Sequence, residues 1–222
     1  YLNTDVLNGR PKYSLQSNGV IRISFLKDIF KNKYLNNFKG QSFAKTYLYY
    51  EPDSASKKIY LNVISDLEGI SFNIMSPIKK IINEKKIFKM SYNFEKKYKN
   101  KLNIFYDKYN LVITAKKDNT LIDVTSTYLK GNILVPENIT STERINAKLS
   151  YFDFNGFKSK SSPIEFPYMK ISINKAKIQE FYLDNVTLVI SPTNDGVALE
   201  NFSFTNNHLS MEGNGKWIVS DD

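Results

Sequence analysis

The run Lys58-Ile59-Tyr60-Leu61-Asn62-Val63 places a branched aliphatic residue at every second position. Successive side chains of a β-strand point to opposite faces of the sheet, so Ile59, Leu61 and Val63 share one face. An α-helix would instead need apolar residues three or four positions apart. The run therefore predicts a strand with one apolar face and one wetter face.

Similar short runs recur along the chain, with residues that favour turns between them. The runs are Leu111 to Ala115, Met169 to Ile173, Val186 to Ile190, Val197 to Phe204 and Leu209 to Met211. Predicted hairpin tips are Asn18-Gly19, Lys117-Asp118-Asn119, Asn194-Asp195-Gly196 and Asn206-Asn207. Many short strands joined by tight turns are typical of a meandering sheet. We therefore expect an all-β, mainly antiparallel fold built as one twisted sheet.

Two segments break the alternation and predict short helices. Apolar residues between Phe25 and Phe38 follow helical spacing, with Ser24 as a candidate N-cap and Gly40 just beyond the end. Residues 77–83 begin with a proline, which is favoured at the first helical position, and predict a second helix.

The composition indicates a folded segment of a longer protein. Hydrophobic residues make up 41% of the 222 residues, enough to form a core. The chain begins at Tyr1 and ends at Asp222 without a terminal signal, so we interpret it as part of something longer. We expect residues 1–222 to form a single segment with a soft boundary near residues 100–110, where the density of lysine falls.

The formal net charge of +9 raises the question of nucleic-acid binding. The excess comes from lysine, because arginine occurs only at Arg10, Arg22 and Arg144, and recognition of bases and phosphates favours arginine. We therefore predict no nucleic-acid partner. The lysines between Lys79 and Lys101 fit either a solvated face or contact with anionic lipid headgroups.

The residue groupings that usually carry catalysis are missing from the sequence. There is no cysteine, and His208 is the one histidine, at a position that predicts a turn entering a strand. Asp66 and Glu68 are interpreted as strand-end or turn residues, and Gly213 to Lys216 as a β-turn or bulge. We predict that the chain is not an enzyme and holds no metal and no cofactor.

Four phrases, in this order, resemble the YhdP branch of the AsmA-like family of bacterial inter-membrane lipid carriers. The most specific is VISDLEGISFNIMSPIKK at residues 63–80, which is similar to that family's strand and proline phrase. The others are GNILVP at 131–136, PIEFPYMKISI at 163–173 and MEGNGKW at 211–217. Together they span most of residues 20–217.

The resemblance implies a long twisted sheet curled into an open groove that conducts phospholipid across the periplasm, from the inner to the outer membrane. It also implies an anchor in the inner membrane through a segment outside this chain, and a role in outer-membrane integrity. The expected partners are phospholipid acyl chains, anionic headgroups, and both membranes through other parts of the protein.

An apolar strand face would contact the acyl chains in such a groove. Parity within each strand selects the candidate lining, although the register between strands stays open. The candidates are Ile59, Leu61, Val63, Leu111, Ile113, Ile171, Ile173, Leu188 and Ile190. Two alternatives remain: a structural or adhesive β-sandwich repeat without lipid cargo, and a hydrolase or carbohydrate-binding domain suggested by scattered tyrosines and Trp217.

Overall fold

The computed structural model describes residues 2–7, 10–30, 36–52, 58–72, 78–94, 101–156, 166–206 and 209–218. Strands account for 71% of the chain, which confirms the predicted all-β, mainly antiparallel fold class. The chain divides into two compact units, Tyr1–Thr114 (unit 1) and Ala115–Asp222 (unit 2). This division falls just beyond the soft boundary expected near residues 100–110.

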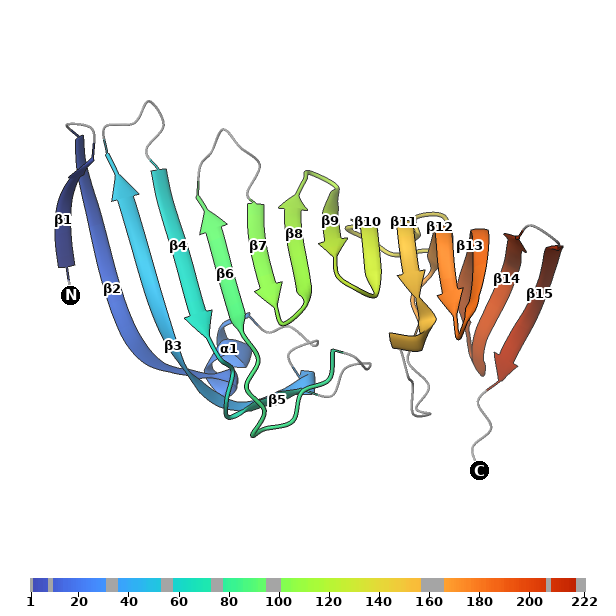
Figure 1. Ribbon diagram of the computed structural model, residues 1–222, viewed down its shortest axis with the longest axis horizontal. Helices are drawn as coiled ribbons and strands as arrows, with labels where there is room; N and C mark the ends of the chain where they lie inside the picture. Colours follow the sequence, from blue (N-terminus) through green and yellow to red (C-terminus); the bar gives the residue numbers. More distant parts are fainter. Residues whose placement is uncertain are drawn as a thin grey trace. The chain divides into compact units, whose positions relative to one another are not determined.

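Unit 1 is an antiparallel sheet in which strands that follow each other in the chain are mostly neighbours (Figure 1). Its hydrogen-bonded order is β1-β2-β3-β4-β6-β7-β8, and β5 pairs with the first part of β3. The elements are β1 (Leu2–Leu7), β2 (Arg10–Arg22), α1 (Ile23–Phe30), β3 (Phe38–Glu51), β4 (Lys58–Ser65), β5 (Ile70–Phe72), β6 (Phe88–Asn93), β7 (Lys101–Tyr106) and β8 (Tyr109–Ala115).

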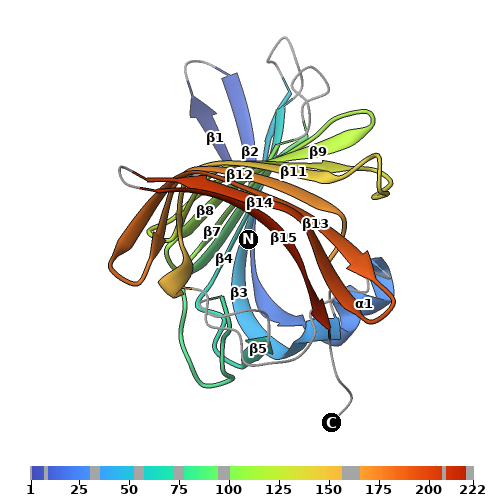
Figure 2. The ribbon, with the colours of Figure 1, turned by 90° about the vertical axis from the view of Figure 1, so that its right-hand side faces the viewer.

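The described residues of unit 2 form seven strands, β9 to β15, hydrogen-bonded in chain order. Its pairings are antiparallel except between β11 and β12, which run parallel. Figure 2 shows β13, β14 and β15 as long, bent strands. The elements are β9 (Asn119–Thr125), β10 (Leu129–Pro136), β11 (Ile145–Asp153), the 3-10 turn η2 (Phe154–Gly156), β12 (Met169–Ile178), β13 (Phe181–Thr193), β14 (Gly196–Thr205) and β15 (Ser210–Ile218).

The alternating runs of the sequence fall within strands, except that Leu209 lies just before β15, and one predicted turn is wrong. Asn18-Gly19 lies inside β2, where Asn18 pairs with Lys45 and Gly19 with Ala44. A residue pair that tolerates a turn does not force one when a neighbouring strand offers a continuous ladder. Asn194 and Asp195 do form the turn between β13 and β14.

Both helix predictions need correction. The helix α1 covers Ile23–Phe30, so Ser24 lies inside it, and Phe38 and Gly40 belong to β3. In the described part of residues 77–83 there is a turn and a bridge, with no helix. The backbone N–H groups of Phe72 and Lys80 each donate to the other residue's carbonyl at 3.0 Å. This extended pairing takes the place of the predicted helix.

Glycines allow β3 to bend at the end of the sheet that carries α1 and β5 (Figure 1). Gly40 has φ +98°, and a Cβ there would lie 2.0 Å from the carbonyl oxygen of Gly69. Gly69 has φ +86°, and its Cβ would lie 2.3 Å from the carbonyl oxygen of Gln41. Only residues without a side chain fit this mutual backbone approach.

Gly40→Ala is therefore expected to destabilise unit 1, and Gly19→Ala is the matched control. The first change combines a strained φ with backbone overlap, so it should cost more than about 2 kcal/mol. A Cβ added at Gly19 would meet nothing within 4 Å, so alanine there should stay within about 0.5 kcal/mol of the parent or stabilise it. Denaturant unfolding followed by circular dichroism measures both, and equal costs would contradict the close approach.

Candidate functional site

The cross-strand register of unit 1 aligns apolar side chains in rows that run across the strands. Residues directly opposite each other in antiparallel strands lie on the same face of the sheet. Leu61 is opposite Leu48 on one side and Tyr92 on the other. The complete row, from β2 to β8, is Leu15, Leu48, Leu61, Tyr92, Leu102 and Ile113.

A second row runs beside the first on the same face. Val63 is opposite Met90, which is opposite Ile104, which is opposite Leu111. All five lining residues predicted within unit 1 therefore share one face. We call the following set the apolar face of unit 1: Leu15, Leu48, Ile59, Leu61, Val63, Met90, Tyr92, Leu102, Ile104, Leu111 and Ile113.

Much of this apolar face remains accessible to solvent. Val63 is buried, at 7% exposure, but Leu15 is 46% exposed and Leu48 is 37% exposed. Ile59, Leu61, Leu111 and Ile113 are half-buried. Such partial exposure is unusual for a row of large apolar side chains and marks a surface suited to an apolar partner.

One end of the face is closed by an aromatic cluster made of Phe38, Phe72, Tyr106 and Tyr109. The ring centroids of Phe38 and Phe72 lie 4.9 Å apart, and those of Phe72 and Tyr106 lie 5.5 Å apart. The Tyr106 hydroxyl donates to the carbonyl of Ile78 at 3.2 Å, and burial raises the pKa of Tyr106 well above its usual range. This end of the face therefore packs as a small core.

Lys80 ties the same closed end together from within. It is 1% exposed, and its Nζ donates to the carbonyl oxygens of Ile70 at 2.7 Å and Ile81 at 3.1 Å. Burial lowers the pKa of Lys80, while the carboxylates of Glu84 and Asp66 act in the opposite direction. Lys80 is thus a cross-link between β5 and the segment that follows it.

The lysines predicted as a headgroup cluster, Lys79 to Lys101, do not form one free patch in the described residues. Besides the buried Lys80, Lys85 pairs with Glu68 at 3.0 Å, and Lys86 pairs with Glu84 at 3.4 Å. Lys89 lies on the other face of the sheet, opposite Phe105. Lys96, Lys97 and Lys99 lie outside the described residues.

The four lining residues predicted in unit 2 also share one face, but this face is packed. Ile171 is opposite Leu188, and Ile190 is opposite Met169. Ile173 is 2% exposed, in a cluster with Val186 and Ala176 that Ile171 and Leu188 pack against. In unit 2, Ile173 therefore lies in a core that Ile171 and Leu188 pack against, and Ile190 is half-buried outside this cluster.

Sequence reasoning missed the middle of the apolar face of unit 1. Met90 and Tyr92 of β6, and Leu102 and Ile104 of β7, complete the rows between β4 and β8. Their period of two was present in FKMSYN and KLNIFY, but the lysines around these short runs obscured it.

The acidic, glycine-rich and histidine positions considered for catalysis or metal binding do not form a common site in the described residues. Asp66 and Glu68 lie in the turn after β4 and pair with Lys85. Gly213 to Lys216 lie within β15, and the ladder with β14 shifts register opposite Gly213 and Gly215, in agreement with the bulge expected there. His208 lies outside the described residues. Within the described part of the chain, no three acidic or histidine side chains group to hold a metal ion.

No family model matches the chain, and neither a characterised protein nor a solved structure matches it. Of the helices in the described ranges, none has the length and apolar character needed to cross a membrane.

Lys80→Met is expected to destabilise unit 1, because it leaves the carbonyls of Ile70 and Ile81 without their donor. The expected cost is about 1–3 kcal/mol. Lys79→Met, at the exposed neighbouring position, should change stability by less than about 0.5 kcal/mol. Denaturant titration of the three proteins measures the difference, and an equally stable Lys80→Met protein would contradict the cross-link.

An aspartate should be tolerated on the apolar face of unit 1 but not in the cluster of unit 2. Ile173→Asp buries an unpaired charge and should cost more than about 3 kcal/mol, whereas water reaches the carboxylate in Leu61→Asp and the cost should stay near about 1–2 kcal/mol. Thermal unfolding and hydrogen exchange report each unit. A Leu61→Asp protein as unstable as Ile173→Asp would show that the face of unit 1 is covered.

Proposed function

We propose that the apolar face of unit 1 binds the acyl chains of phospholipid. The observation that carries this proposal is the unbroken apolar row from Leu15 on β2 to Ile113 on β8. Five inter-strand steps of about 4.8 Å give the row a length of roughly 24 Å. One leaflet of a bilayer holds acyl chains over about 15 Å, so a chain fits along the row.

The energetics favour such an occupant. Each methylene that leaves water contributes about 0.8 kcal/mol, and half-exposed leucine and isoleucine side chains gain as well when a lipid covers them. The polar remainder of the lipid would stay at the open edge, away from the aromatic cluster. No catalytic group is needed for this role.

The resemblance to the AsmA-like family supports a wider proposal. In it, the chain is a non-catalytic part of a periplasmic protein, held at the inner membrane by another segment. It conducts phospholipid toward the outer membrane and so supports outer-membrane integrity. Anionic headgroups would contact exposed lysines such as Lys79. Fewer lysines are available for this contact than the sequence suggested, because Lys80, Lys85 and Lys86 have partners within the chain.

A structural β-repeat without lipid cargo is the second candidate function. The buried cluster around Ile173, Val186 and Ala176 favours it, because unit 2 covers its own apolar side chains. The two candidates differ in what touches the apolar face of unit 1.

The test is a photo-crosslinking amino acid placed at Leu61, with the same amino acid at Asn62 as the matched control. These neighbours lie on opposite faces of β4. The chain is expressed in a bacterium, illuminated, and analysed by mass spectrometry. Crosslinked phospholipid at Leu61 and at least about tenfold less at Asn62 is expected; no lipid at Leu61, or equal amounts at both positions, would contradict the proposal.

A further inference from the structure

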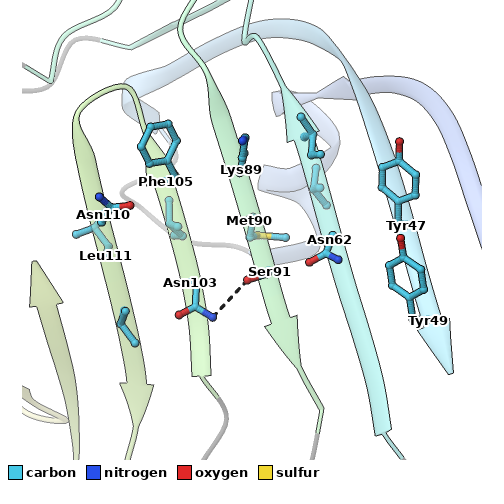
Figure 3. A pocket seen from close by; sticks show the side chains of 14 residues that line it. Tyr47, Tyr49, Asn62, Lys89, Met90, Ser91, Asn103, Phe105, Asn110 and Leu111 are labelled. Atoms are coloured by element: carbon cyan, nitrogen blue, oxygen red, sulfur yellow. Dashed lines mark hydrogen bonds between the residues drawn. The ribbon is translucent and has the colours of Figure 1, made fainter. Parts of the chain in front are cut away.

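The opposite face of unit 1 carries an open groove of about 540 Å³ that the acyl-chain proposal does not use (Figure 3). Its volume lies in the range of ligand sites in proteins. Side chains of Tyr47, Tyr49, Asn62, Asn103 and Phe105 line it. By the strand register, these residues alternate with those of the apolar face.

Two tyrosine rings form a flat platform along β3. The centroids of Tyr47 and Tyr49 lie 6.4 Å apart, and their ring planes differ by 6°. Figure 3 shows one ring following the other along the strand, with both hydroxyls pointing the same way. Aromatic faces carry negative partial charge, so they attract the C–H bonds of a flat ligand, and the hydroxyls add polar contacts at the edge.

A row of polar side chains crosses the strands beside the platform. Tyr47 is opposite Asn62, which is opposite Ser91, which is opposite Asn103. The Asn103 amide donates to the Ser91 hydroxyl at 3.3 Å. Amides and hydroxyls both donate and accept hydrogen bonds, as sugar hydroxyls do.

The charge of the residues that line the groove restricts the class of ligand further. Lys89 is the one charged side chain among the described residues that line the groove. Single-stranded nucleic acid also stacks on tyrosine, but it brings one phosphate per nucleotide and is bound in grooves with several cations. A neutral ligand fits a groove with a single cation better.

We propose that this groove binds a neutral oligosaccharide, of the flat kind whose pyranose rings are joined by β-1,4 links and carry equatorial substituents. Such rings present axial C–H bonds to the Tyr47–Tyr49 platform and hydroxyls to the row from Asn62 to Asn103. Tyr47, Tyr49 and the polar row lie on the face opposite the acyl-chain face, although four residues of the apolar face also line the groove: Val63, Met90, Ile104 and Leu111. The variants that test the site change only Tyr47 and Tyr49 within the groove, so their outcome is independent of the acyl-chain proposal.

Isothermal titration calorimetry of the 222-residue chain tests the proposal with cellohexaose and chitohexaose as probes. Binding of at least one probe with a dissociation constant below about 1 mM is expected. The double change Tyr47→Val and Tyr49→Val keeps strand-favouring residues and should weaken binding at least about tenfold. Tyr47→Phe with Tyr49→Phe keeps the rings and should stay within about threefold of the parent.

Phe43→Val is the matched control, because Phe43 is an exposed aromatic residue of the same strand and face outside the groove, and its loss should leave binding unchanged. The proposal is overturned by an absence of binding of both probes below about 1 mM. It is also overturned by a valine double variant that binds like the parent, or by tighter binding of hexathymidylate than of either sugar.

Discussion

Cross-strand register is the constraint on which both surfaces of unit 1 depend. Each strand sends alternate side chains to opposite faces, and a slip of one residue between two strands would exchange them. The pairings of β4 with β3 and β6, and of β7 with β6 and β8, run without a shift through the described residues. The apolar row and the polar row therefore remain on opposite faces of the sheet across these strands.

The same alternation has a different outcome in unit 2, where some ladders contain register shifts. The ladders of β10 with β11, β13 with β14, and β14 with β15 each contain a shift. An extra residue bends its strand and changes which side chains face inward. Figure 2 shows this bending in β13 to β15. The buried cluster lies on β11 to β14, and its residues Ile173 and Val186 pair in a ladder without a shift.

The sequence was sufficient to predict the strands with clear alternation, such as β4, but not β6 and β7 or the surroundings of the side chains. Apolar residues at every second position of residues 58–63 identified β4 and its apolar face. Such alternation shows directly which side chains of a strand share a face. The exposure of a side chain depends on bulges and on neighbouring elements. The burial of Ile173 and the exposure of Leu48 were therefore not predictable from the sequence. The burial of Lys80 was not predictable either. A lysine in a lysine-rich segment is expected to be exposed to solvent, and only the pairing of Phe72 with Lys80 buries it.

In the function proposed for unit 1, its two faces differ in what they bind, and the apolar face takes acyl chains. Methyl-resolved NMR of the chain with a phospholipid spin-labelled on its acyl chain tests this most directly. We expect strong broadening of the methyl signals of Leu61, Leu102 and Ile113, with the signals of Ile64 and Val112 on the other face preserved. Equal broadening on both faces, or none on either, would contradict the proposal.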